Sequence, residues 1–309
     1  MATQAPQQPG TGLARTPLGE NKGAFRIEGL SDPLKKKWLN CLFYAAPGAG
    51  KTTLAGSIVD VPPARDVLFI AAESGELTLE DNPRIEHPDD IDVVRIQRIE
   101  QLQKIFEFLY AHCMFRDQGN LAKLEELQRV TFGIPAGEDV GRIREYHSVV
   151  LDSISEIEAQ NLTKILDLAS QGVDAGADMA TADWPAYRAN NNQIQRITRQ
   201  FRDLPVHFIC IAAQAYSQDE RKRYHYTPAL AGKLKDQIQG FFDVVGWLVP
   251  SEAQTPEQIE SGATPRRLFV QPQASPRADA KCRISSYRRA YFDDPVMRDI
   301  LKATGFSIE

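Results

Sequence analysis

Short apolar runs alternate along this chain with segments in which apolar residues recur at helical spacing. The apolar runs are continuous, which is typical of strands buried on both faces of a parallel sheet. We predict strands at residues 39–46, 66–73, 91–96, 147–152, 206–213 and 242–249. We predict helices at residues 51–59, 100–116, 155–170 and 184–204. This order favours an α/β fold in which helices cover both faces of a mostly parallel central sheet.

Three stretches depart from that alternation. Residues 1–21 are rich in Gln, Pro, Gly, Ala and Thr without periodicity, so we expect a disordered tail. Residues 115–145 contain four glycines and one proline, and we interpret them as an insertion. Within residues 265–309 we expect a late β-hairpin, formed by residues 267–270 and 281–284, and a helix. Residues 22–309 are therefore predicted to form a single domain.

The composition narrows the class of protein. The 309 residues are 42% hydrophobic, which is enough for a sizeable core. The net charge of −5 gives no global basic field, so any contact with nucleic acid must be a local patch. The four cysteines form no C-x-x-C pair, which favours a reducing cytoplasm over a disulfide framework or a zinc site. No apolar run reaches the ~18 residues of a membrane span, and we expect a cytoplasmic protein without a membrane partner.

The stretch YAAPGAGKTT at residues 44–53 indicates a phosphate-binding loop between a strand and a helix. Its backbone N–H groups would surround phosphate oxygens, Lys51 would reach the terminal phosphates, and the Thr52 hydroxyl would bind Mg²⁺. Ala45 stands where a strict motif has its first glycine, and alanine is tolerated there if φ stays negative. The predicted nucleotide-binding residues are Ala46, Pro47, Gly48, Ala49, Gly50, Lys51, Thr52 and Thr53.

Polar residues follow three other strands, at the sheet edge where ligands of parallel sheets bind. Asp152 is a candidate Mg²⁺ ligand, although it could instead cap the following helix. Many ring-forming ATPases have their catalytic glutamate at the next position, which here is Ser153. Glu73 is therefore our candidate base, with Glu76 as a weaker competitor and a solvent-facing loop acid as the alternative. Gln214 is a candidate sensor of the γ-phosphate, or simply a polar strand end.

The segments APGAGKTT, FIAAE, VVLDS and ICIAAQ, in this order, resemble the core of the RecA-like ATPases over about residues 39–249. DW-x-x-Y, P-x-L-x-G-K and FDVV make the chain similar, more narrowly, to phage-encoded RecA-like proteins of the single-strand annealing and recombination type. The resemblance implies a Mg-ATP site with Lys51, Glu73 and Gln214 as catalytic residues. It also implies a slow ATPase that DNA or oligomerisation stimulates, in the host cytoplasm if the chain is phage-encoded.

The segment after Gln214, SQDERKRYHYTPALAGKLK, combines cations with tyrosines. Cations can follow phosphates and tyrosine rings can stack on the bases of single-stranded DNA. In the RecA-like core a DNA-binding loop follows the sensor glutamine, and the second such loop would be the acidic residues 171–183. A solvated loop remains the alternative. The candidate DNA-binding residues are Arg221, Lys222, Arg223, Tyr224, Tyr226 and Lys233.

Lys281 and Arg283 lie two residues apart, so on a strand they share a face. RecA-like filaments complete each ATP site with cations from the adjoining subunit, and the resemblance implies that role here, within a homo-oligomer. Two other functions stay open. One is an ATP-driven assembly switch that does not bind DNA, and the other is a small-molecule kinase with residues 221–223 as a lid.

Overall fold

The computed structural model describes residues 38–169, 184–252, 264–274, 277–284 and 287–309. The chain divides into two units, Met1–Lys37 and Trp38–Glu309, and the second unit contains all of the described residues. The expected tail at residues 1–21 and the acidic loop at residues 171–183 lie outside the described residues. Among the described helices, none is long and apolar enough to span a membrane.

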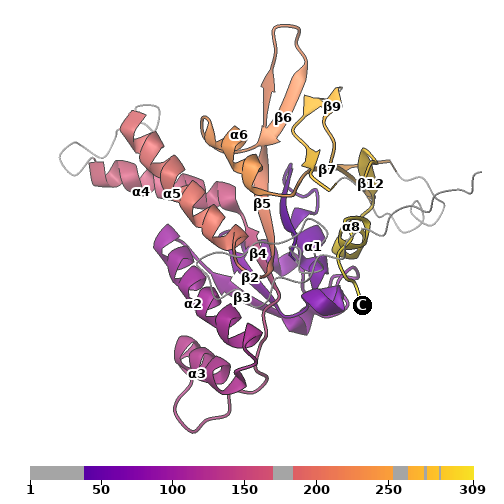
Figure 1. The fold of residues 1–309 in the computed structure, drawn as a ribbon. Coiled ribbons are helices and arrows are strands. Elements are labelled where there is room, and N and C mark those ends of the chain that lie inside the picture. The colour runs from indigo at the N-terminus through magenta and orange to yellow at the C-terminus, as the bar shows by residue number, and fades with distance from the viewer. Residues whose placement is uncertain (1–37, 170–183, 253–263, 275–276, 285–286) are drawn as a thin grey trace, which may run out of the picture. The chain divides into compact units, whose positions relative to one another are not determined.

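A mostly parallel sheet forms the centre of this unit, as the sequence predicts (Figure 1). Its strands follow the order β12-β8-β7-β1-β5-β4-β2-β3. The parallel strands are β7 (Val244–Pro250), β1 (Asn40–Ala45), β5 (His207–Gln218), β4 (Ser148–Asp152), β2 (Val67–Ala71) and β3 (Ile91–Arg95). β8 (Arg266–Phe269) pairs antiparallel with β7, and β12 (Tyr291–Asp293) pairs antiparallel with β8. The α/β fold class is therefore confirmed.

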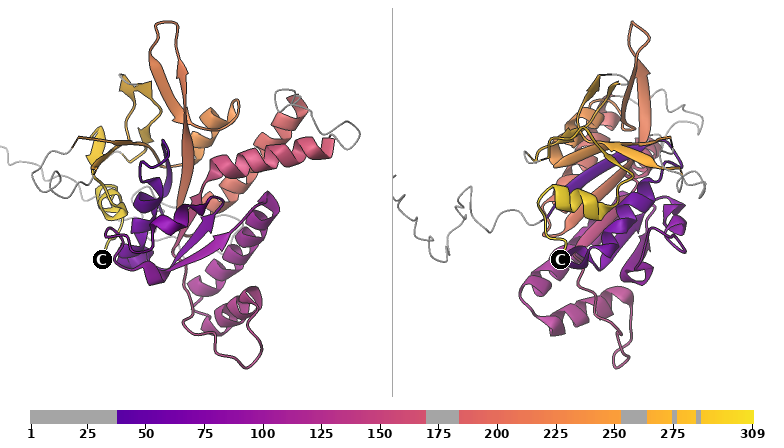
Figure 2. Two further views of the ribbon diagram at one scale, coloured as in Figure 1. Left: turned by 180° about the vertical axis from the view of Figure 1, so that it is seen from behind. Right: turned by 90° about the vertical axis from the view of Figure 1, so that its right-hand side faces the viewer.

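Apolar residues cover both faces of the sheet because successive strand residues point to opposite sides. On β1, Leu42 and Tyr44 belong to one buried cluster, whereas Cys41 and Phe43 belong to the other. The first cluster is covered by α2 (Ile99–Asp117), α4 (Ile154–Ala169), α5 (Trp184–Arg202) and α6 (Leu234–Ile238). The second is covered by α1 (Lys51–Gly56) and α8 (Met297–Ala303), and Figure 2 shows both arrangements from two further sides.

The segment after Gln214 is a β-hairpin rather than the loop expected from the sequence. β5 continues beyond the sheet to Gln218, and residues 214–218 pair antiparallel with β6 (Tyr224–Pro228). We call residues 214–228 the arm, and Figures 1 and 2 show it projecting from the sheet. The Asp219 carboxylate accepts the backbone N–H groups of Arg221 and Arg223, each at 2.9 Å, and closes the turn. The sequence analysis predicted a loop because the residues of the turn and of its two flanking strands are mostly polar, with no apolar run to indicate a strand.

Two late segments also pair differently from expectation. Residues 267–270 and 281–284 do not pair with each other, because β8 and β11 (Lys281–Cys282) both add to the free edge of β7. The described hairpin of this region joins β9 (Gln273–Ala274) to β10 (Arg277–Ala278), which in turn pairs with β6. Strand pairing over such separations depends on which edge is open in the folded sheet, and the sequence pattern does not encode that.

The region at residues 115–145 that we interpret as an insertion begins inside a core helix. α2 extends to Asp117, and α3 (Leu121–Phe132) then packs beside it. The Asn120 side chain accepts the N–H of Lys123 and caps α3, and Gly133 ends it with a left-handed φ of 68°. Arg142 and Arg144 then form ion pairs with Asp66, which attach the following segment to the start of β2.

Candidate nucleotide-binding site

The carboxyl ends of four neighbouring strands meet at one edge of the sheet. In the pairing register Ala71 lies opposite Asp152, Asp152 opposite Ile211, and Ala45 opposite Ala213. The residues that directly follow these positions therefore face one another across the edge. This arrangement brings the predicted phosphate loop together with the segments that carry Glu73, Asp152 and Gln214.

The loop after β1 has a backbone that glycine makes possible. Gly48 and Gly50 have φ angles of 74° and 87°, in the left-handed region that favours glycine. α1 starts at Lys51 directly after them, so its free N–H groups and the positive end of its dipole face the loop. Ala45 lies fully buried in the strand and has no positive φ, which explains why alanine is accommodated there.

The Lys51 side chain folds back over this loop. Its Nζ donates to the carbonyl oxygens of Ala45 and Ala46 at 3.2 and 3.1 Å. Burial lowers the pKa of Lys51, while the charges of Asp152 and Glu73 act in the opposite direction. The ammonium group is therefore fixed on the loop carbonyls and feels the charge of both carboxylates, in the region where the sequence predicts the terminal phosphates.

Thr52 and Asp152 form a pair of oxygen ligands suited to magnesium. The Thr52 Oγ1 donates to Asp152 Oδ2 at 2.6 Å, and Asp152 is only 3% exposed. Burial is the largest influence on the pKa of Asp152 and raises it. A hard divalent cation would compensate a buried carboxylate of this kind, and hydroxyl and carboxylate oxygens are the ligands Mg²⁺ prefers. The side chains present therefore fit Mg²⁺.

Gly75 closes this pair from the side, which the sequence did not reveal. A Cβ atom added to Gly75 would lie 2.7 Å from Asp152 Oδ2 and 3.1 Å from Thr52 Oγ1. Any side chain at this position would therefore displace the two ligands. The only available signal was a glycine directly after the candidate base segment, in FIAAESGE.

The Glu73 carboxylate is held by Ser153, the residue at the position where many ring-forming ATPases have their catalytic glutamate. The Ser153 hydroxyl donates to Glu73 Oε1, and Ser153 is almost completely buried whereas Glu73 is exposed. Glu76, the weaker competitor, is buried and forms an ion pair with Arg95 at 2.7 Å between Nε and Oε1. Glu73 is therefore the accessible one of these two carboxylates, and its charge acts on both Asp152 and Lys51.

Gln214 is connected to the sheet and to the arm. Its Oε1 accepts the indole N–H of Trp247 at 2.7 Å. Trp247 is 5% exposed and stacks on Tyr226 of β6 with ring centroids 4.8 Å apart. Sequence reasoning missed Trp247, because it lies on a strand that was predicted only as an apolar run.

The candidate DNA-binding residues fall into two places. Arg221, Lys222 and Arg223 lie together at the turn of the arm, where Arg223 is paired with Asp219 at 2.8 Å. Tyr224 and Tyr226 lie on β6. Tyr216 on β5 lies opposite Tyr226, and its ring also contacts that of Tyr224.

Lys233 is not part of the arm. It lies at the start of α6 and is exposed. The arm therefore joins five of the six candidates, and Lys233 stands apart from them.

Lys281 and Arg283 do not join the site of their own chain. β11 pairs with Val244 and Val245 at the beginning of β7, toward the edge opposite the phosphate loop. Lys281 Nζ donates to the Gln239 carbonyl, and Arg283 Nη2 donates to the Gly240 carbonyl at 2.7 Å. Burial, followed by the charge of Arg283, lowers the pKa of Lys281 to about 8.

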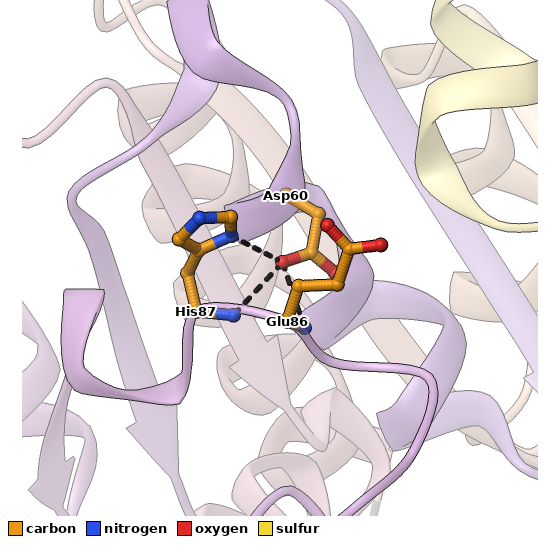
Figure 3. Close-up of side chains that lie close together, drawn as sticks. All are labelled: Asp60, Glu86 and His87. Carbon is orange, nitrogen blue, oxygen red and sulfur yellow. Dashed lines mark hydrogen bonds and ion pairs between the residues drawn. The ribbon is translucent and has the colours of Figure 1, made fainter.

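A separate cluster of Asp60, Glu86 and His87 has spacing suitable for a metal (Figure 3). Asp60 Oδ1, however, already accepts the backbone N–H groups of Glu86 and His87 at 3.0 Å and faces His87 Nδ1 at 3.1 Å. These hydrogen bonds explain the cluster as an anchor for the loop that precedes β3.

Comparison with known proteins identifies one matching protein family and several solved structures of low sequence identity. A family model described as an AAA domain matches residues 37–284. No curated protein matches the chain. Among solved structures, the RadB recombinase is 11% identical with a TM-score of 0.38, covering 75% of this chain and 79% of that chain. The flagellar accessory protein FlaH from Methanocaldococcus jannaschii is 8% identical with a TM-score of 0.38, covering 82% and 84%.

Proposed function

This chain belongs to the AAA domain family. We propose that it is a RecA-like P-loop protein that binds Mg-ATP and hydrolyses it slowly while acting on single-stranded DNA. The observation that carries the nucleotide part is the convergence of Lys51, the Thr52–Asp152 pair and the Ser153–Glu73 pair at one sheet edge. Phosphoryl transfer requires mainly positioning and charge stabilisation, and these residues supply both.

Each residue has a defined task in this mechanism. The loop N–H groups and Lys51 bind the phosphates. Thr52 and Asp152 would hold Mg²⁺, which would neutralise charge on the phosphate oxygens. Glu73 orients the attacking water and accepts its proton, while Ser153 fixes the carboxylate. Gln214 senses the γ-phosphate from the neighbouring strand.

We also propose that the site is completed by a second copy of the chain. Lys281 and Arg283 lie too far from their own phosphate loop to act in it, so any role on phosphate would be in trans. An adjoining subunit that supplied these cations would stabilise the charge of the transferring phosphoryl group. Homo-oligomers with ATP at the subunit interfaces would follow from this.

The arm supports the DNA part of the proposal. Tyr216 and Tyr224 are 67% and 47% exposed, with ring centroids 5.6 Å apart, and they lie just below the cationic turn. Exposed aromatic faces beside cations are what single-stranded nucleic acid requires, since bases stack and phosphates pair. Recombination, annealing and replication are processes in which a protein of this kind would act.

The nucleotide part is tested by ATPase assays on the wild type and on Lys51→Ala, each with and without single-stranded DNA. We expect activity in the wild type only, and stimulation by DNA. Wild-type protein without any ATPase activity at any concentration would contradict the proposal.

The DNA part is tested by binding of a labelled single strand at several salt concentrations. Changing residues 221–223 to serine should lower the salt slope by roughly 2, since each phosphate contact on a single strand contributes about 0.7. Tyr216→Ala should weaken binding by about 1–3 kcal/mol, as expected for one stacked base. Tyr110, which is 63% exposed on α2, provides the matched control, and Tyr110→Ala should bind like the wild type. ATP-dependent oligomers that never bind DNA would instead identify an assembly switch.

A further inference from the structure

Arg266 reaches the phosphate loop from a strand more than two hundred residues later in the chain. Its Nη1 donates to the Gly50 carbonyl at 3.2 Å, and the separation in sequence is 216 residues. A Cβ atom added to Gly50 would lie 2.1 Å from the Arg266 Cζ. The guanidinium group therefore packs directly on the backbone of the residue that precedes Lys51.

The contact acts on a peptide group that faces the phosphates. The Gly50 carbonyl also accepts the Leu54 N–H at 3.0 Å, the first hydrogen bond of α1. The peptide bond is planar and trans, so the N–H of Lys51 points away from that carbonyl, toward the N-terminal side of α1. A cation on the carbonyl end fixes the orientation of this peptide and polarises the N–H at its other end.

The surroundings of Arg266 leave its charge largely uncompensated. Asp294 interacts with its backbone, accepting the Arg266 N–H at 3.2 Å, but the Asp294 carboxylate is paired with Arg84 at 2.5 Å. Within the described part of the chain, no carboxylate lies within 4 Å of the Arg266 guanidinium. Burial is the largest influence on the pKa of Arg266 and lowers it, the charge of Arg84 lowers it further, and the charge of Asp294 raises it. Two arginines and one carboxylate thus give net positive charge beside the anion site, and arginine keeps its proton.

We propose that Arg266 is a positioning residue for nucleoside di- and triphosphates, acting in cis by holding the Gly50–Lys51 peptide in its phosphate-binding orientation. This inference rests on the proposed nucleotide site and extends it to the C-terminal strands. Arg266 acts on ground-state binding, so its loss raises the KM for ATP and leaves kcat almost unchanged.

The next residue provides a matched control. Arg267 points to the other face of β8, as consecutive strand residues do. Its Nε pairs with Asp293 at 2.9 Å, and its guanidinium lies 4.2 Å from the centre of the Tyr291 ring. Arg267→Ala therefore removes the same chemical group from the same strand without touching the phosphate loop.

The experiment measures Mg-ATP and Mg-ADP affinity by calorimetry on the full chain, and KM and kcat in the ATPase assay. Arg266→Ala should weaken the binding of both nucleotides about tenfold, the value of one hydrogen bond from a charged group. Arg266→Lys, which keeps the charge, should recover part of the affinity, and Arg267→Ala should match the wild type. Circular dichroism and thermal unfolding identify any variant that fails to fold, and Arg266→Lys then serves as the test.

The outcomes separate this inference from the proposed function. If the wild type binds ATP, Lys51→Ala does not, and folded Arg266→Ala binds as tightly as the wild type, the Arg266 inference is wrong and the nucleotide site stands. A fall in kcat at unchanged nucleotide affinity would also overturn it. If the wild type itself binds no nucleotide, the proposed function fails, and the inference fails with it.

Discussion

Removing the Ser153 hydroxyl tests whether Glu73 is the base of this site. The hydroxyl donates to the Glu73 carboxylate and accepts the Glu156 N–H at 3.3 Å, and Ser153 is 1% exposed, so Ser153→Ala removes these two bonds without opening a large cavity. Glu73 itself is exposed, and in this variant it loses the contact that sets its orientation. We expect a lower kcat and an unchanged affinity for Mg-ATP.

The size of the effect follows from the type of hydrogen bond. Hydrogen bonds to a charged group contribute about 1.5–3 kcal/mol. Because water can replace the hydroxyl at an exposed carboxylate, we expect the lower end of that range, which corresponds to about a tenfold fall in kcat. Glu73→Gln removes the base itself and should lower kcat by about 10²–10⁴.

A double-mutant cycle measured by steady-state ATPase kinetics decides the point. If Ser153 acts only through Glu73, then Ser153→Ala should have almost no effect when Glu73 is already Gln. Calorimetric ATP binding is the control, and it should be the same in all four proteins. A tenfold loss from Ser153→Ala in both backgrounds would refute the assigned roles, since the serine would then act independently of Glu73.

Three further predictions concern the metal, the trans cation and stability. Asp152→Asn removes a charged Mg²⁺ ligand, so in a Mg²⁺ titration the concentration for half-maximal ATPase activity should rise at least about tenfold. An unchanged concentration would exclude Asp152 as a ligand. With a pKa of about 8, Lys281 is charged below that pH and neutral above it, so its contribution to ATPase activity should fall as pH rises through 8. Lys281→Arg should keep the charge and remove this step from the pH profile, and a step that persists would have another origin. The hydroxyl of the fully buried Tyr44 donates to the Asp279 and Tyr226 carbonyls at 2.7 and 3.2 Å. Tyr44→Phe should therefore lower the free energy of unfolding, measured by urea titration, by about 1–3 kcal/mol. An unchanged free energy of unfolding would show that water replaces these bonds.

The sequence was sufficient for elements whose residues form a continuous apolar pattern. The six runs predicted as strands are the six parallel strands of the sheet, and their bounds differ from the prediction by only a few residues except at the end of β5. β1, β2 and β4 are buried along their whole length, so their identity depends on their own composition, whereas β3 at the sheet edge is only partly buried. The phosphate loop could also be predicted from the sequence, because its residues Gly48, Gly50, Lys51 and Thr52 lie close together in the chain.

The arm shows where local pattern failed. Residues 214–228 are polar and charged, and they were predicted as a loop because no apolar run marks them. In the structure they form two strands. The exposed rings of Tyr216 and Tyr224 pack across the hairpin, and Tyr226 stacks on Trp247 of the central sheet. Cross-strand side-chain pairs stabilise such a hairpin, and they exist only once the register is set.

The order of residues along the chain was enough to predict the parallel strands, the phosphate loop and the sheet edge at which Glu73, Asp152 and Gln214 lie, although β5 continues past Gln214. The partners of the site residues were visible only in the folded chain: Ser153 on Glu73, Trp247 on Gln214, and Arg266 on the loop. The difference lies in the range of the interactions. Apolar burial follows from the periodicity of neighbouring residues, whereas a hydrogen bond needs two atoms within about 3 Å, and for residues far apart in sequence that distance is set by the pairing of whole strands.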